Sequence, residues 1–185
     1  MNNPLLSMAP FETLPLGPEL ISDLQSDHAG EAGAVAIYRG MLDVSRDTAV
    51  RRFALKHIRT ELRHLHFFEH WLPHRHHSCL LLLWRSAGWL LGAVSALFGR
   101  QAVFRTVAAV EAFVEGHYRA QIETMQSVSG LEPLVAVLQD FCAEEVHHGA
   151  DASARLTDSA GVLAQAWSSV IAVGSTLGVS VARRI

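Results

Sequence analysis

The sequence predicts an all-α protein: a four-helix bundle with one long crossover that contains an apolar helix, followed by a C-terminal helix. Three observations predict this class. Apolar residues recur every three to four positions along four long segments, as in helices with one buried face. The chain has no alternating strand pattern and no Asn-Gly hairpin signal. A long connection, about residues 73–100, separates the second of these segments from the third.

Local signals define the first two helices. We expect residues 1–17 to form an irregular lead-in, because they hold three prolines and lack the basic start of a signal peptide. Pro18 suits the first turn of the first helix. Asp47 can cap the second helix. That helix must stop before Pro73, because a proline disfavours helical backbone in the residue before it.

The rest of the chain divides in the same way. An apolar stretch over residues 79–98 lies within the crossover. A fourth helix is predicted over about residues 101–127, before a break at Gly130. A fifth opens at Pro133 and runs to about residue 157, and a weaker sixth spans about residues 159–184. With 185 residues in all, we expect residues 18–185 to form a single domain.

Composition excludes several classes of protein. Half of the residues are hydrophobic, which excludes a disordered chain. The net charge of −3 provides no basic field, so no nucleic-acid partner is expected. The two cysteines lack CxxC spacing, which gives no support to a disulfide framework or a thiolate zinc site. Histidine is abundant, with eleven residues.

Acidic residues interrupt the apolar seams of the four long helices. Each of these acids is in phase with the apolar residues around it and should therefore point into the core. A lone buried carboxylate is costly and is normally paired or metal-bound. Four helices that each place a glutamate in the core therefore predict a shared cation. The candidate ligands are Glu31, Glu61, His64, Glu111, Glu145 and His148.

Two of these helices carry a Glu-x-x-His pair, which places an oxygen and an imidazole on one helix face. One glutamate from each of two helices, with Glu-x-x-His from each of the other two, is the ligand set of ferritin-like di-iron bundles. Hard oxygen ligands with imidazole suit iron or manganese. The order Glu, then Glu-x-x-His, occurs once in each half of the chain and indicates an internal duplication.

Three alternatives remain open at the level of the residues. Glu144 and His147 form an overlapping Glu-x-x-His pair in a different register. Glu115 lies one turn after Glu111 on the same face and is a substitute ligand. All of these side chains could also be solvated acids and surface histidines of ordinary amphipathic helices.

Four motifs, in order along the chain, resemble those of the demethoxyubiquinol hydroxylases of ubiquinone biosynthesis. They are DHAGEAGA with IYRG (residues 27–40), ELRHL (61–65), VEAFVEGHY (110–118) and FCAEEVHH (141–148). The resemblance covers about residues 20–185, although Ala112 and Ala143 stand where the family has acids. It implies two iron ions on the six candidate ligands. It also implies that Glu145 and His148, and not Glu144 and His147, are the ligand pair of the fifth helix. It also implies O₂ and a polyprenyl quinol as substrates.

The resemblance assigns roles to two further residues, His117 and Tyr118, as catalytic candidates. Tyr118 is in phase with Glu111 and is expected to form a hydrogen bond near the irons or to gate electron entry. The alternative is a core tyrosine with a satisfied hydroxyl. The histidines of the 74–77 segment lie outside the family motifs, and we expect them to be solvated.

The apolar stretch over residues 79–98 is interrupted by Arg85, which would be costly inside a bilayer. We therefore expect a helix in the membrane interface, with Arg85 and Arg100 near lipid headgroups. The alternative is a helix buried across the bundle. The predicted location is peripheral, on the cytoplasmic face of a bacterial inner membrane. The resemblance also implies a lipid-binding accessory protein of the same pathway as a partner, and a homo-oligomer is a further expectation.

Two other functions compete with this interpretation. A ferritin-like iron-binding or storage protein, without quinol turnover, would keep the same ligands. A soluble storage shell needs no exposed apolar crossover, however, and the four consecutive leucines at residues 80–83 argue against it. A non-enzymatic member that has kept only the fold would not need all six ligands.

Overall fold

The computed structural model describes residues 8–157 and 161–184, and every regular element in that part of the chain is a helix. The helices are α1 (Pro18–Val44), α2 (Thr48–Trp71), α3 (Leu81–Leu97), α4 (Arg100–Gln126), α5 (Glu132–Ser153) and α6 (Val162–Ala182). Two short 3₁₀ turns, η2 (Phe11–Thr13) and η3 (His74–His76), precede α1 and α3. The predicted all-α class is confirmed.

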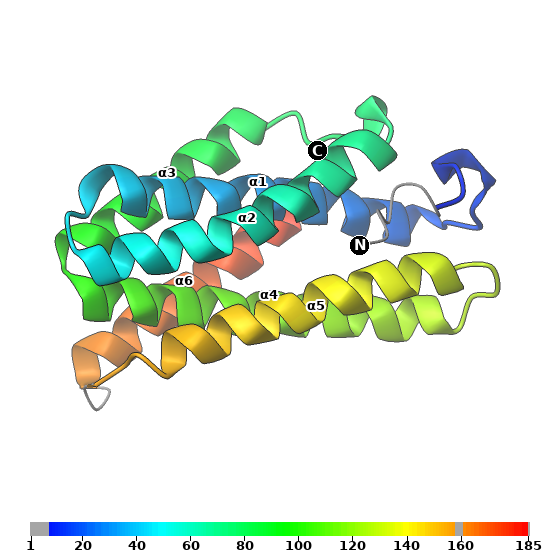
Figure 1. Ribbon diagram of the computed structural model, residues 1–185. Coiled ribbons are helices and arrows are strands. Elements are labelled where there is room, and N and C mark those ends of the chain that lie inside the picture. Colours follow the sequence, from blue (N-terminus) through cyan, green and yellow to red (C-terminus); the bar gives the residue numbers. More distant parts are fainter. Residues whose placement is uncertain (1–7, 158–160, 185) are drawn as a thin grey trace.

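The four long helices form two antiparallel hairpins that pack together, α1 with α2 and α4 with α5 (Figure 1). The crossover after α2 contains η3 and α3, and it returns the chain to the end of the bundle where α2 began. Helix α4 therefore runs in the same direction as α2 (Figure 1). This is the topology expected of a ferritin-like bundle. It allows the two hairpins to face each other across one core.

The helix ends follow the local chemistry of the sequence. Asp47 caps α2 as predicted, because its carboxylate accepts hydrogen bonds from the backbone N–H groups of Ala49 and Val50. Gly130 ends the turn between α4 and α5 with a φ of 93°, a conformation that favours glycine. Helix α5 ends four residues earlier than expected, at Ser153. After it the backbone forms hydrogen bonds between residues three apart, such as Arg155 N–H to the Ala152 carbonyl.

Helix α3 lies along α1 at unusually short range. A Cβ atom at Gly88 or Gly92 would collide with the carbonyl oxygens of Gly33 and Ile37. The opposite face of α3 is exposed, with 80% of Leu82 and 74% of Leu97 accessible to solvent. The crossover helix is therefore not buried across the bundle, because only one of its faces is covered.

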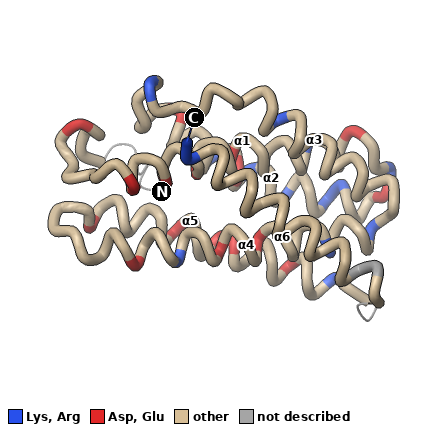
Figure 2. Tube along the Cα trace, turned by 180° about the vertical axis from the view of Figure 1, so that it is seen from behind, with Lys and Arg blue, Asp and Glu red and all other residues tan. Residues whose placement is uncertain are grey.

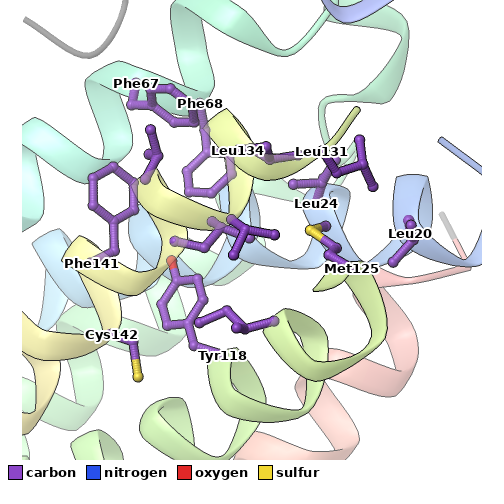
Figure 3. Close-up of a cluster of buried hydrophobic side chains, with 14 of the residues drawn as sticks. Leu20, Leu24, Phe67, Phe68, Tyr118, Met125, Leu131, Leu134, Phe141 and Cys142 are labelled. Carbon is purple, nitrogen blue, oxygen red and sulfur yellow. The ribbon is translucent and has the colours of Figure 1, made fainter. Parts of the chain in front are cut away.

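The core consists of two apolar clusters at the two ends of the bundle. Figure 3 shows the cluster formed with the α4–α5 turn, to which Leu24, Tyr118, Met125 and Phe141 belong. The second cluster lies toward the α1–α2 turn and includes Val50, Phe53, Val103 and Phe104. The residues that separate the clusters along all four helices are the buried glutamates and histidines. A polar layer is therefore enclosed between two apolar layers.

Helices α3 and α6 expose apolar surface that carries few charges. Residues 162–182 of α6 hold no charged side chain, and α3 holds only Arg85 (Figure 2). Val170, Val173 and Leu177 of α6 are all at least 60% exposed. Within the described residues, however, no helix combines the length and the hydropathy needed to cross a bilayer.

Candidate metal centre

Six ligand-type side chains from four helices meet in the polar layer of the bundle. Each has at most 5% of its surface exposed. They are the six residues singled out from the sequence: Glu31 of α1, Glu61 and His64 of α2, Glu111 of α4, and Glu145 and His148 of α5. The structure therefore brings the whole candidate ligand set together in one place.

The six residues form two overlapping groups of four. One group is Glu31, Glu61, His64 and Glu145, and the other is Glu61, Glu111, Glu145 and His148. In each group, one ligand atom from every residue lies within 4.8 Å of the others. Glu61 and Glu145 belong to both groups. The other two residues of each group are one glutamate and one histidine, and we call Glu31 and Glu111 the terminal glutamates.

Both histidines turn the Nδ1 atom toward the carboxylates. His64 Nδ1 lies 2.9 Å from Glu145 and 3.5 Å from Glu31. His148 Nδ1 lies 2.9 Å from Glu61, 3.2 Å from Glu145 and 4.0 Å from Glu111. Each imidazole therefore approaches the Glu-x-x-His glutamate of the other hairpin, which ties the two halves of the bundle together.

The donor atoms of this layer fit a bound cation. Five of them are buried and lack a hydrogen-bond partner of acceptable geometry, although they lie within ion-pair distance of one another. These atoms are Glu31 Oε2, Glu61 Oε1, His64 Nδ1, Glu145 Oε1 and His148 Nδ1. Buried polar groups without partners are rare in folded proteins, because each costs free energy. Metal ions coordinated by these atoms would satisfy all of them.

The electrostatics of the layer agree with this fit. Burial, together with the charge of Glu145, raises the pKa of Glu61 to about 8. For Glu145 burial acts in the same direction, but the close imidazoles of His148 and His64 outweigh it and lower the pKa to about 2. Burial alone would lower the pKa of His148, yet Glu145 and Glu61 raise it to about 9. The layer thus concentrates negative charge that protons neutralise when no cation is bound.

Two buried tyrosines support the terminal glutamates from the opposite hairpin. The Tyr118 hydroxyl of α4 donates a hydrogen bond of 2.6 Å to Glu31 of α1. The Tyr38 hydroxyl of α1 donates a bond of 3.1 Å to Glu111 of α4. The pKa of both hydroxyls is raised well above its usual value by burial and by the neighbouring glutamates, so both remain donors.

The structure distinguishes the two Glu-x-x-His registers of α5. Glu145 points into the layer. Glu144 instead accepts a hydrogen bond of 2.7 Å from the Nε2 atom of His64, on the outer side of that ring, and it also pairs with Arg63. His147 lies on the exposed side, 3.4 Å from the Lys56 amine. Glu115 also points away from the layer and pairs with Arg119 at 2.7 Å, so it is not among the clustered donors.

His117 lies beside the layer but not in it. Its Nε2 atom is 2.9 Å from the carboxylate of Asp27, which also accepts a hydrogen bond from Gln121 at 2.8 Å. Burial lowers the pKa of His117, but Asp27 outweighs it and the pKa is raised overall. His117 therefore pairs with a buried carboxylate next to Tyr118.

An apolar cavity of about 410 Å³ connects this centre with the surface between α1, α3, α4 and α6. All four glutamates of the polar layer line it, as do Tyr118 and His117. The rest of its wall is mainly apolar and includes Ile37, Trp84, Leu91, Val110, Val114 and Ile171. A ligand of this shape would place a polar head against the carboxylates and an apolar body along α3 and α6.

Sequence reasoning missed three of these supporting groups: Tyr38, Asp27 and Glu144. Tyr38 was detectable, because it follows Glu31 by seven residues as Tyr118 follows Glu111. The roles of Asp27 and Glu144 depend on partners on other helices and had no local signal. The 74–77 segment also differs from expectation, because His77 is half-buried and its ring packs 4.2 Å from that of His28.

Comparison with known proteins identifies the family. The family model of the ubiquinone biosynthesis protein COQ7 matches residues 19–182. The chain belongs to the COQ7 family. The 3-demethoxyubiquinol 3-hydroxylase of Rhodospirillum rubrum is 34% identical over 168 residues, which cover 88% of this chain and 76% of that protein.

Two mitochondrial relatives of this COQ7 family chain carry the name NADPH-dependent 3-demethoxyubiquinone 3-hydroxylase. The human protein is 32% identical over 169 residues, or 88% of this chain and 76% of its own length. The mouse protein is 34% identical over 147 residues, which cover 76% of this chain and 68% of the mouse protein. The family assignment and the ferritin-like helical fold expected from the sequence motifs are thus confirmed.

Proposed function

We propose that this COQ7 family chain is a 3-demethoxyubiquinol 3-hydroxylase, a monooxygenase that hydroxylates the quinol ring with O₂ in ubiquinone biosynthesis. One observation carries the proposal: an apolar cavity of about 410 Å³ ends on four buried glutamates. A prenylated quinol has a polar ring and an apolar tail, which match the two ends of this cavity. The names of the relatives support the same substrate.

The cofactor in this proposal is a pair of iron ions. Glu31 and His64 would hold one ion, Glu111 and His148 the other, and Glu61 and Glu145 would be shared by both. The mixture of carboxylates and imidazoles would suit iron, and all four glutamates also line the cavity. When bound, the iron ions supply the activation of O₂ that the side chains cannot supply themselves.

The residues of the chain have three tasks in this reaction. The apolar wall of the cavity excludes water and holds the tail, so the ring is directed to the glutamate end. Tyr118 fixes Glu31 through its hydroxyl and also faces the cavity. His117, which pairs with Asp27, is placed to exchange a proton beside the ring-binding end of the cavity.

The substrate of such an enzyme is a membrane lipid, which gives a function to the exposed faces of α3 and α6. Both helices line the cavity with one face and expose apolar side chains on the other. Trp84 of α3 and Gly178 of α6 both line the cavity, so the two helices flank one opening. We propose that this surface docks peripherally on the membrane, on the cytoplasmic face of a bacterial inner membrane.

Iron storage without quinol turnover is the alternative use of the same centre. Storage requires only the six ligands and gives no role to the apolar cavity or to the Asp27–His117 pair. The cavity therefore favours hydroxylation over storage.

The deciding experiment is complementation of a ubiquinone-deficient bacterial strain that lacks its own hydroxylase, with quinones measured by mass spectrometry. We expect the chain to convert demethoxyubiquinone to the hydroxylated product. Glu111→Gln should abolish conversion, whereas Glu123→Gln, an exposed glutamate on the same helix, should retain it. Iron-loaded protein that accumulates no hydroxylated product would exclude the hydroxylase and favour storage.

A further inference from the structure

The last two turns of α2 present two histidines to solvent on the side away from the polar layer. His66 and His70 are exposed, whereas His64, two residues before His66, is fully buried in the candidate centre. We infer that His66 and His70 form a second metal site, separate from the buried centre. Its ligand would be a divalent cation that prefers imidazole, such as Cu²⁺, Ni²⁺ or Zn²⁺.

The spacing of the two histidines suits shared coordination. Residues four apart lie one above the other on a helix, and the two rings are 3.8 Å apart between centroids with an angle of 43° between their planes. Histidines at this spacing on one helix face provide two nitrogen ligands to zinc in metalloprotease helices. Small rotations of two exposed side chains bring such rings around one ion.

A hydrogen bond already fixes the tautomer of one ring. His70 Nδ1 lies 2.8 Å from the backbone carbonyl oxygen of His66. Because a carbonyl oxygen can only accept, the hydrogen of neutral His70 must lie on Nδ1. The lone pair is then on Nε2, at the outer side of the ring. This is the arrangement in which bound metals are usually held, with the second nitrogen oriented by a carbonyl or carboxylate.

No carboxylate competes for these rings or joins them. Within residues 8–157 and 161–184, neither His66 nor His70 forms an ion pair, and the nearby Glu69 is paired with Arg85 at 3.4 Å. The site therefore offers two nitrogens and water, whereas the buried centre offers mainly oxygens. First-row divalent ions bind such nitrogen sites in an order that peaks at Cu²⁺. Copper is therefore the most sensitive probe.

The neighbouring loop histidines are engaged elsewhere and provide matched controls. The ring of His74 contacts that of His77 at 4.8 Å. His76 packs on Phe11 at 5.2 Å. Both follow Pro73, where α2 has already ended.

The test is a titration of the iron-loaded full-length chain with Cu²⁺, followed by calorimetry and electron paramagnetic resonance. We expect one copper per chain with a spectrum from two nitrogen ligands. His66→Ala or His70→Ala should weaken binding at least about tenfold, because each removes one arm of a chelate. The double variant should be little worse than either single one.

His74→Ala and His76→Ala should bind copper like the wild type, because both leave the pair of His66 and His70 intact. Copper affinity within twofold of wild type in both His66→Ala and His70→Ala would overturn the inference. Because His66 and His70 are exposed, circular dichroism is expected to show an unchanged fold in these two variants.

Discussion

Tyr118 of α4 reaches across the bundle and donates a hydrogen bond of 2.6 Å to Glu31 of α1. Tyr38 of α1 makes the reciprocal bond to Glu111 of α4. In each hairpin the tyrosine follows the glutamate by seven residues, which is two helical turns. The internal duplication is therefore more than a repeated sequence pattern, because each half orients the terminal glutamate of the other.

The two tyrosines differ in what they face. Tyr118 lines the apolar cavity, whereas Tyr38 does not and packs near Phe53 and His57 instead. The pseudo-symmetric centre thus has one tyrosine on the cavity side and one in the core. Tyr118→Phe should impair both metal binding and turnover, while Tyr38→Phe should act through metal binding alone.

The first prediction concerns metal affinity in these two variants. Each substitution removes the donor to a buried glutamate, and lost support of a ligand typically weakens metal binding about 10–100-fold. We expect Tyr38→Phe to weaken the ion held by Glu111 and His148, and Tyr118→Phe the ion held by Glu31 and His64. Titration of metal-free protein with Mn²⁺ or Fe²⁺ measures this. Unchanged affinity in both variants would show that the hydroxyls do not orient ligands.

The second prediction separates the two adjacent glutamates of α5. Glu145 belongs to both ligand groups, so Glu145→Gln should lower iron content toward zero per chain. Glu144 pairs with Arg63 and reaches the polar layer only through the outer nitrogen of His64, so Glu144→Gln should weaken one ion and leave the other. Elemental analysis of purified variants checks this, with Glu123→Gln as the control. Iron lost only from Glu144→Gln would show that the opposite register is correct.

The third prediction follows from the raised pKa of Glu61. Burial and the charge of Glu145 raise it to about 8 from an ordinary value of 4.5. Between these values the folded metal-free protein holds a proton that the unfolded chain releases. That proton contributes its full share of the free energy of unfolding below about pH 4.5, and this contribution is lost as the pH rises through 8. His148, whose pKa is raised to about 9, acts in the same direction.

Metal-free protein should therefore unfold at lower urea concentration at pH 8 than at pH 5.5. Metal binding should show the opposite trend, because ions must displace these protons, and it should release protons into a weakly buffered solution. Glu61→Gln should flatten the dependence of stability on pH. A urea midpoint that rises between pH 5.5 and 8 in the wild type would contradict the prediction.

The bundle and the ligand set could be predicted from the sequence because both depend on periodicity. Glu31, Glu61, Glu111 and Glu145 interrupt regular apolar seams, so their phase alone directs them to the core. The partners of the ligands could not be predicted in the same way. The contacts of Glu144 with His64 and of Asp27 with His117 join residues that are 80 and 90 positions apart. They depend on how the helices are rotated against each other.

The position of α3 shows the same limit. Its apolar character was evident from the sequence, but which face would be covered depended on the short-range packing of Gly88 and Gly92 against α1. Glycines in a helix lower its intrinsic stability, so their presence in α3 is explained only by the neighbouring backbone.

The fourth prediction tests this packing. Gly92→Ala places a methyl group against the carbonyl of Ile37, so we expect destabilisation of about 1–3 kcal/mol from overpacking. Gly116→Ala, on the exposed face of α4 with nothing within 4 Å of the new atom, should instead stabilise the protein by about 0.5–1 kcal/mol. Urea unfolding of both variants gives the comparison. Equal effects of the two substitutions would show that α3 does not lie so close to α1.

The fifth prediction concerns the exposed face of α3. Leu82 and Leu97 are 80% and 74% exposed, and in the proposed docking mode they enter the acyl boundary of the membrane. Changing both to serine should reduce flotation with phospholipid vesicles, because about 1.5–3 kcal/mol of burial is lost for each leucine. Leu55→Ser with Leu62→Ser is the matched control, since these leucines are 50% and 41% exposed on α2, which does not flank the cavity opening.

The α3 variant should still hydroxylate a short-chain quinol that dissolves in water, because neither leucine lines the cavity. Its defect should be confined to long-chain substrate presented in vesicles. If instead the α2 variant loses vesicle binding while the α3 variant retains it, the membrane-facing side of the bundle is the opposite of the one proposed. Measuring flotation and both activities on the same protein samples separates this outcome from a general loss of folded protein.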